Sequence, residues 1–345
     1  MSLNISLSSV RTERPHIACV IPCYKVRNHI LQVLSQIGPE VSSIYVVDDL
    51  CPEHSGQLVQ TECHDQRVRV IFNAKNLGVG GAVMRGYAAA IDAGAEIIVK
   101  IDGDNQMDPT LLLSFVAPIL SGDADYVKGN RFFDPEALSE MPFIRIFGNS
   151  CLSFLAKLST GYWNLFDPTN GYTAIHATVA KLLPAKKISQ RYFFETDILF
   201  RLNSIGAVAV DLPMTSSYAN EVSNLRISKI IPEFLAKHAR NTWKRLIYKY
   251  LIRDFSIATF ELIGGICLVL FGIVYGLSRW HLSATSGLPA TAGMVMLAAL
   301  PTFVGIQFLL AFLNYDITSV PRRPLHPTLT SRLRSINSFA NSNKI

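Results

Sequence analysis

The chain of 345 residues is poor in charged side chains, which make up 17% of it, against about 25% in ordinary soluble domains. Hydrophobic residues, at 49%, are correspondingly frequent. This combination argues against a purely soluble protein and predicts a soluble part joined to a membrane part. Residues 1–15 are polar and contain no apolar run, so we expect a polar tail there and no signal peptide.

Several familiar site patterns are missing. The six cysteines form no CxxC pair and no Cys/His set with zinc spacing, so we expect reduced thiols in a cytosolic compartment. The glycine-rich segment 76–86 lacks the Lys-Ser/Thr ending of a P-loop and does not directly follow a strand, which disfavours a dinucleotide-binding fold. Basic residues gather beside the apolar segments and no RNA- or DNA-binding motif appears, so we expect no nucleic-acid partner.

Two long apolar segments in the C-terminal third predict a transmembrane hairpin. Ala290–Leu313 has no charged residue and is long enough to cross a bilayer, and Ile257–Leu277 carries only Glu261. Ser278–Pro289 would form the outer turn. The alternative is a pair of buried core helices, which are seldom apolar all round. Glu261 would lie near the headgroups or pair with a basic neighbour in an oligomer. A homo-oligomer is plausible because a lone hairpin is a small membrane domain.

Basic residues on either side of the apolar segments predict the orientation. Lys and Arg are frequent between 226 and 253 and again between 322 and 344, whereas the outer turn offers only Arg279. The positive-inside rule then places the large soluble domain and both termini in the cytosol. Residues 225–251 also alternate apolar and basic residues at helical spacing, which favours interfacial helices on anionic membrane lipids. The alternative is a helix with a solvated charged face, packed against the soluble domain.

From residue 16 to about 214, short apolar strands alternate with helical patterns at 80–93 and 109–120. This order predicts an α/β fold whose mostly parallel sheet is covered by helices on both faces. In such sheets ligands bind at the carboxyl ends of the strands. The expected strands are His16–Ile21, Ser43–Asp48, Val68–Phe72, Glu96–Ile101 and Asp125–Lys128. The expected regions are a tail (1–15), a catalytic domain (16–225), interfacial helices (226–254), a transmembrane hairpin (255–314) and a basic tail (315–345).

An acidic turn follows the fourth expected strand. Asp102 and Asp104 stand one residue apart, and Gln106 adds a third oxygen. Mg²⁺ and Mn²⁺ prefer such ligands and usually bind through a carboxylate or two plus substrate phosphates. A plain turn is the alternative, since turns are rich in Asp and Gly, but the position after an apolar strand favours a metal site. In segment 76–86, amides at a helix start favour anions and Arg85 adds positive charge.

Seven motifs in order resemble the family 2 glycosyltransferases of GT-A fold, within the branch of dolichyl-phosphate mannosyltransferases and polyprenyl-phosphate glycosyltransferases. Each motif alone is weak, whereas the ordered set is specific. The resemblance covers residues 16 to 215, and the hairpin also fits the anchored members. The motifs are Val20-Ile-Pro-Cys-Tyr24, Tyr45-Val-Val-Asp-Asp49, Asn76-Leu-Gly-Val-Gly80, Asp102-Gly-Asp-Asn-Gln106, Gly129-Asn-Arg131, Asp167-Pro-Thr-Asn-Gly171 and Phe194-Glu-Thr-Asp197.

The resemblance implies roles for these residues. Arg131 and Arg145 would bind the acceptor phosphate, because Arg suits bidentate phosphate contacts; the alternative for each is a surface ion pair. Asp197 would act at the reaction centre or simply face solvent. The implied sets are Pro22, Tyr24, Asp48, Asp49, Gly78, Gly80, Arg85 and Asp102 for the nucleotide sugar; Asp102, Asp104 and Gln106 for Mg²⁺ or Mn²⁺; Arg131, Arg145, Asn149 and Ser150 for the acceptor phosphate; and Asp104, Asp167, Glu195 and Asp197 for catalysis.

The implied reaction is an inverting transfer of a sugar from a UDP- or GDP-sugar to a polyprenyl phosphate. A phosphate acceptor is already anionic, so alignment and leaving-group stabilisation suffice without a strong base. Departures from the family pattern at Lys25-Val26, Leu50-Cys51 and Thr173 leave base and sugar open. A processive polysaccharide synthase would normally carry a Gln-x-x-Arg-Trp segment, which is absent. An inactive membrane scaffold is the other alternative, and the intact acidic turn argues against it.

Overall fold

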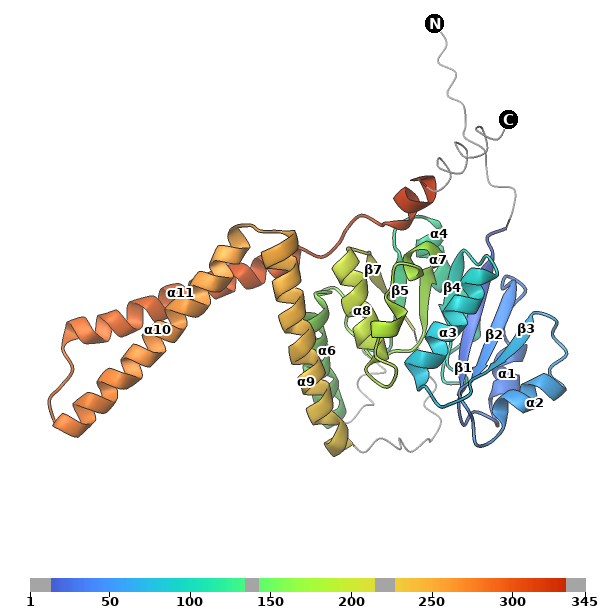
Figure 1. Cartoon of the computed structure of the whole chain (residues 1–345), viewed down its shortest axis with the longest axis horizontal. Coiled ribbons are helices and arrows are strands. Elements are labelled where there is room, and N and C mark those ends of the chain that lie inside the picture. Colours follow the sequence, from blue (N-terminus) through green and yellow to red (C-terminus); the bar gives the residue numbers. More distant parts are fainter. Residues whose placement is uncertain (1–13, 134–142, 215–226, 333–345) are drawn as a thin grey trace, which may run out of the picture.

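The computed structural model describes residues 14–133, 143–214 and 227–332, without the side chains of Arg145 and of residues 227–230. Its N-terminal part is built on one seven-stranded sheet of order β3-β2-β1-β4-β6-β5-β7 (Figure 1). The five strands expected from the sequence are confirmed to within two residues at each end. The strands are β1 (Ile17–Cys23), β2 (Ser43–Asp48), β3 (Val68–Phe72), β4 (Ile97–Lys100), β5 (Tyr126–Asn130), β6 (Thr173–His176) and β7 (Ala209–Pro213).

The strands β6 and β7 were not expected from the sequence, and β6 decides the layout of the sheet edge. It runs antiparallel between β4 and β5, and its first residue, Thr173, pairs with both Lys100 and Lys128. All other pairs are parallel. An antiparallel strand brings its amino end to the edge where its parallel neighbours end. The loop that precedes β6 therefore lies beside the carboxyl ends of β4 and β5.

Helices cover both faces of the sheet, as expected for a mostly parallel α/β fold. Along β1, Cys19 and Ile21 face one apolar core and Ala18 and Val20 face the other. The first core lies under α1 (Ile30–Ser35), α2 (Ser55–Glu62), η1 (Pro109–Leu111) and α4 (Leu112–Leu120). The second lies under α3 (Val79–Asp92), α7 (Ala177–Ala180) and α8 (Phe194–Ile205), whereas the short η2 (Ala185–Lys187) has no buried residue.

Two long helices, α6 (Phe143–Thr160) and α9 (Ile227–Leu246), pack side by side at the border of the sheet domain (Figure 1). The side of α9 that faces the domain is polar, with His238, Asn241 and Arg245 buried. Its outer side exposes large apolar side chains, and so does α6. Helix α9 thus packs against the domain, as the alternative supposed, but its exposed side is partly apolar, and contact with lipid stays a prediction. The exposed apolar residues are Phe143, Ile144, Phe147 and Phe154 on α6 and Ile231, Leu235 and Trp243 on α9.

A π-helical turn, η3 (Ile247–Arg253), leads into the helical hairpin of α10 (Ile257–Ser286) and α11 (Ala292–Thr318), which projects from the sheet domain (Figure 1). Only 22% and 11% of the most apolar stretch of each helix is buried, so these are not core helices of a soluble fold. Their length and composition indicate a membrane protein. The expected outer turn was wrong in extent: α10 continues through the polar residues to Ser286, because an exposed helix tolerates them.

The helices of the hairpin approach closely because small residues line their contact. A Cβ added to Gly265 would come within 3.0 Å of the backbone oxygen of Gly305, and one added to Gly305 would come within 2.9 Å of the oxygen of Gly265. Such small residues at helix contacts are typical of membrane bundles.

The chain beyond α11 returns to the sheet domain (Figure 1). The backbone amides of Leu325 and His326 and the His326 ring all lie 2.8–2.9 Å from the buried carboxylate of Asp125. The His326 ring also stacks on His176, with 4.4 Å between the ring centroids. The described part of the basic tail is therefore docked on the domain, and residues 333–345 lie outside the described chain.

Candidate active site

Strained backbone marks one edge of the sheet. Within the described ranges, the non-glycine residues with positive φ are Lys25, Leu50, His54 and Asn105, with φ between 55° and 61°. They follow the carboxyl ends of β1, β2 and β4. Such conformations are costly and gather at functional sites. The candidate site is therefore the carboxyl edge of the sheet, where ligands of α/β folds bind.

The two carboxylates that end β2 are buried and fully engaged. Asp48 accepts hydrogen bonds from the amides of Cys51 and Gly56, both at 2.8 Å. Asp49 accepts from Asn73 Nδ2 and from the amides of Leu77 and Gly78, at 2.7–2.8 Å. The pair thus organises the loops around the expected nucleotide pocket, and direct nucleotide contact stays a prediction. Pro22 and the exposed Tyr24 stand at the end of β1.

The glycine-rich segment owes its composition to close packing. A Cβ on Gly78, whose φ is +83°, would lie 2.5 Å from the Gln190 carbonyl oxygen, and Gly80 is equally crowded by Ser189. The Gly80 amide donates to the Gln190 carbonyl at 2.8 Å. Arg85 is bound to the Phe72 carbonyl and to Asn73 Oδ1. The amides of Gly78 and Gly80 and the guanidinium of Arg85 therefore already have partners within the protein, and contact of this segment with the donor stays a prediction.

The acidic turn after β4 rests on a buried lysine. Lys100 Nζ lies 2.8 Å from Asp102 Oδ1 and 3.4 Å from Glu195 Oε1 at the start of α8. Burial alone would lower the pKa of Lys100, but the two carboxylates raise it above its ordinary value. Asp104 accepts the amide of Gln106 at 3.1 Å. Lys100 thus links the turn to Glu195, and the catalytic role of Glu195 stays a prediction.

The Asp167–Gly171 loop faces this turn. Asp167 is fully buried and accepts hydrogen bonds from Arg131 Nε at 2.7 Å and Nη2 at 3.0 Å. Burial would raise the pKa of Asp167, but Arg131 outweighs this and lowers it. Gly171, at the end of the loop, packs directly against Asp102. An ion pair for Arg131 is therefore confirmed, with a buried rather than a surface partner, and contact with phosphate stays a prediction.

The remaining predicted residues are not part of the contact between the Asp167–Gly171 loop and the acidic turn. Asp197 is buried and binds the Ser189 amide at 2.8 Å and Asn241 Nδ2 at 3.0 Å, so it ties α8 to α9. It does not face solvent, and its geometry favours a supporting role over a catalytic one. In α6, Ser150 Oγ donates to the Ile146 carbonyl and Asn149 is half-buried. The side chain of Arg145 lies outside the described residues.

The oxygen donors of the acidic turn fit a divalent cation. Within residues 14–133, 143–214 and 227–332, no group of three or more His, Cys, Asp or Glu side chains is arranged to hold a metal ion. Mg²⁺ and Mn²⁺ need fewer protein ligands when substrate phosphates complete the sphere. Asp102 and Asp104 are half-exposed and so accessible to a substrate-bound ion. The residues present therefore fit a cation that arrives with a diphosphate.

Three charged residues of the site were missed from the sequence: Lys100, Lys128 and Asp211. Lys128 is fully buried beside Lys100 and donates to the Asn170 carbonyl in the Asp167–Gly171 loop. Burial lowers its pKa to about 8. Asp211 accepts from the Phe166 amide at 2.8 Å, and burial raises its pKa to about 6. A lysine inside an apolar strand is itself a signal, since lysine is almost never buried without a partner.

Comparison with known proteins shows which family and which relatives this chain is similar to. Residues 18–183 match the family model described as "Glycosyl transferase family 2". A UDP-N-acetylglucosamine--dolichyl-phosphate N-acetylglucosaminyltransferase of Methanococcus voltae is 27% identical over 50% of this chain and 74% of its own. An undecaprenyl-phosphate mannosyltransferase of Micrococcus luteus is 28% identical over 57% of this chain and 81% of its own.

A solved structure supports the fold. Glucosyl-3-phosphoglycerate synthase from Mycobacterium tuberculosis, in complex with Mn²⁺, UDP-glucose and phosphoglyceric acid, has a TM-score of 0.51 at 19% identity. The match covers 66% of this chain and 80% of that one. The expected GT-A-like α/β fold is thereby confirmed.

Proposed function

Because residues 18–183 are a glycosyl transferase family 2 domain and the chain is thus a glycosyltransferase, we propose that it transfers a sugar from a UDP- or GDP-sugar to a polyprenyl phosphate. A single in-line displacement would invert the anomeric carbon. Two relatives are named for dolichyl- and undecaprenyl-phosphate transfer, which supports this class of acceptor. The two apolar helices support an acceptor that resides in a membrane.

One observation carries the proposal: the acidic turn, which would hold the donor, touches the Asp167–Gly171 loop, which would form the acceptor loop. Gly171 packs against the Asp102 carboxylate, and Lys100 lies between that carboxylate and Glu195. A diphosphate bound at Asp102 and a phosphate bound near Arg131 would then meet across one contact. Holding two reactants in this way supplies a large part of the rate enhancement of a transfer reaction.

We assign the donor side to the acidic turn. Asp102, Asp104 and Gln106 would hold Mg²⁺ or Mn²⁺ with the donor diphosphate. The bound cation would neutralise the charge of the leaving diphosphate. Asp48 and Asp49 would shape the nucleotide pocket by holding its loops, as their hydrogen bonds to loop amides indicate. Residues that would border the donor are Pro22, Tyr24, Gly78, Gly80 and Arg85.

We assign the acceptor side to the loop before β6. Asp167 fixes the guanidinium of Arg131, which would bind the lipid phosphate, with Arg145, Asn149 and Ser150 of α6 completing the site. Glu195 would face the sugar beside Lys100. The phosphate is already anionic, so the chain needs to orient it rather than deprotonate it.

We further propose that the sheet domain and both termini lie in the cytosol, with the apolar sides of α6 and α9 on the bilayer surface. The exposed aromatic residues of these helices and the basic segments flanking the hairpin support this orientation. A maleimide that cannot cross membranes should label Ser286→Cys in intact cells and Glu62→Cys only after permeabilisation, both in a Cys151→Ser, Cys267→Ser background. The reverse labelling pattern would show the opposite orientation in the membrane and refute this proposal.

The reaction is tested with the full chain in detergent, a short polyprenyl phosphate, Mn²⁺ or Mg²⁺, and a panel of UDP- and GDP-sugars. Mass spectrometry should show one glycolipid with one donor. Asp104→Asn should abolish the product. Asp108→Asn is the matched control, because Asp108 lies on the same loop but only caps the next turn through Thr110, and Asn also caps well.

Other products would favour the other functions. A ladder of products with several sugars would identify a processive synthase. The absence of product with every donor, together with no cation-dependent nucleotide binding, would overturn the proposal and favour a membrane scaffold.

A further inference from the structure

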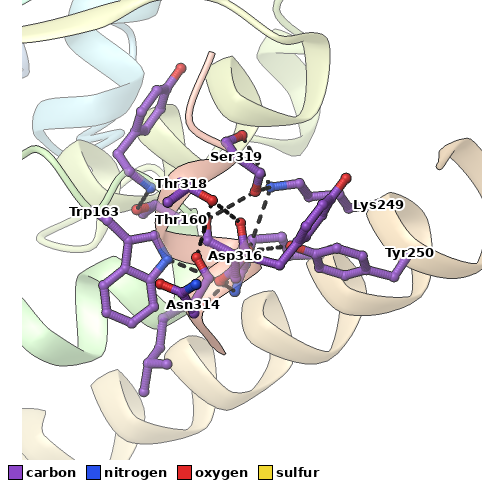
Figure 2. Close-up of polar contacts among 12 residues, drawn as sticks. Thr160, Trp163, Lys249, Tyr250, Asn314, Asp316, Thr318 and Ser319 are labelled. Atoms are coloured by element: carbon purple, nitrogen blue, oxygen red, sulfur yellow. Dashed lines mark hydrogen bonds and ion pairs between the residues drawn. The ribbon is translucent and has the colours of Figure 1, made fainter. Parts of the chain in front are cut away.

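A buried carboxylate lies at the end of the hairpin nearest the sheet domain. Asp316, near the end of α11, is 1% exposed. Arg245 Nη1 and Nη2 lie 2.7 and 2.9 Å from its two oxygens. Tyr250 Oη lies 2.5 Å from Asp316 Oδ1 (Figure 2). Buried charges are stable only when paired and hydrogen-bonded, as this one is. Asp316 thus binds α11 to α9 and η3.

The same carboxylate also reaches the sheet domain. Trp163 Nε1 donates to Asp316 Oδ2 at 2.9 Å across 153 residues of sequence (Figure 2). Arg245 Nε donates in addition to the Leu158 carbonyl at the end of α6. A single side chain of the membrane hairpin therefore contacts the segment that connects α6 to β6.

That segment leads directly to the acceptor loop. After Trp163, Asn164 Nδ2 donates to the Ala209 carbonyl and the Phe166 amide donates to Asp211, so the sheet holds the backbone. The next residue is Asp167, which carries the ion pair with Arg131. Only three residues separate the contact with the membrane helix from the carboxylate of the candidate acceptor site.

We propose that the Trp163–Asp316 contact positions the acceptor loop relative to the membrane, so that the phosphate of a membrane-embedded acceptor meets Arg131. The inference rests on the proposed function. The phosphate of a lipid sits at a restricted depth, and a loop anchored on the end of a membrane helix is held at a constant height above the hairpin. Trp163 and Asp316 are positioning residues here, since neither would touch the substrate.

Trp163→Phe is the sharpest test. It removes the Nε1–H donor but retains an aromatic ring near Phe154, whose centroid lies 6.2 Å from that of Trp163. Asp316 keeps Arg245 and Tyr250, so the buried charge stays paired and the fold should persist. His326→Ala is the matched control, because it loosens the same C-terminal segment at Asp125, away from the hairpin.

Two acceptors with the same phosphate group separate positioning relative to the membrane from phosphate binding itself. One is a long polyprenyl phosphate in nanodiscs, and the other is a short, water-soluble prenyl phosphate. Trp163→Phe should raise KM for the embedded acceptor about fivefold, the lower end of coupling between sites. KM for the nucleotide sugar and for the soluble acceptor should stay unchanged, as should every constant of His326→Ala. An equal rise for both acceptors, or an unchanged KM for the embedded one, would overturn the proposal.

Amide hydrogen exchange measures the effect of the Trp163–Asp316 contact on the loop without any need for turnover. It therefore tests this inference separately from the proposed function. In nanodiscs, amides of residues 164–171 should exchange faster in Trp163→Phe than in the parent and in His326→Ala. Unchanged protection in Trp163→Phe would overturn the inference even if the protein proved inactive. If the wild-type protein forms no glycolipid while Trp163→Phe still shows the faster exchange relative to it, the proposed reaction alone would be refuted.

Discussion

Gly171→Ala should disable the site through a single added methyl group. A Cβ at this position would lie 2.6 Å from Lys100 Nζ and still closer to Asp102 Oδ2. Neither neighbour can retreat easily. Lys100 is 1% exposed and lies between two carboxylates, while Asp102 has a short side chain directly after a strand. The turn that would hold the donor must therefore move.

The expected magnitudes follow from that overlap. Overpacking a filled interior costs about 1–3 kcal/mol of unfolding free energy. A displacement of about 1 Å at a reacting group lowers the rate by about 100-fold. We therefore expect a moderate loss of stability and a much larger loss of kcat, because the displaced carboxylate belongs to the site itself.

The assay combines the thermal unfolding midpoint in detergent with donor turnover at saturating acceptor. Gly293→Ala is the control, because nothing lies within 4 Å of a Cβ added there. It should leave both quantities unchanged. Wild-type turnover in Gly171→Ala would refute the reasoning, since the donor turn would then tolerate displacement or lie outside the active site.

Further predictions concern charge and metal. Burial raises the pKa of Asp211 from its ordinary 3.8 to about 6, so this carboxyl lowers folded-state stability progressively as the pH rises from about 4 to about 6, and the full penalty is present above pH 6. Asp211→Asn should therefore raise the unfolding midpoint at pH 7.5, by an amount worth at most about 3 kcal/mol, and the gain should vanish as the pH falls toward 4; a gain independent of pH would contradict this. Asp49→Asn places an amide where three donors converge and should lower stability by about 1–3 kcal/mol in thermal unfolding; an unchanged midpoint would argue against its role in holding the loops. Chelation with EDTA should stop sugar transfer, and added Mn²⁺ or Mg²⁺ should restore it; full turnover in EDTA would exclude the cation from the acidic turn.

Local patterns in the sequence were sufficient for much of this protein. The strands β1 to β5 are short apolar runs, and each hairpin helix contains a long apolar stretch, so composition was enough to locate them, although it placed the end of α10 too early. The acidic turn was predictable for the same reason, because Asp102 and Asp104 directly follow an apolar strand. Their positions depend on neighbours in the chain rather than on distant contacts.

The roles of the other acidic residues depended on tertiary structure. Asp48, Asp49 and Asp197 match the motifs, yet their partners are loop amides and an asparagine brought from elsewhere in the chain. The motif alone cannot distinguish a carboxylate that binds substrate from one that holds a loop, because both need the same residue at the same position.

The longest-range features were decided by the fold alone. The antiparallel pairing of β6 places the Asp167–Gly171 loop against the turn after β4, and no local pattern specifies which edge a short strand joins. Trp163 and Asp316 meet across 153 residues. A contact of this kind exists only once α6, α9 and the hairpin have packed together, because packing of distant elements, and not the identity of the two residues, brings donor and acceptor within reach.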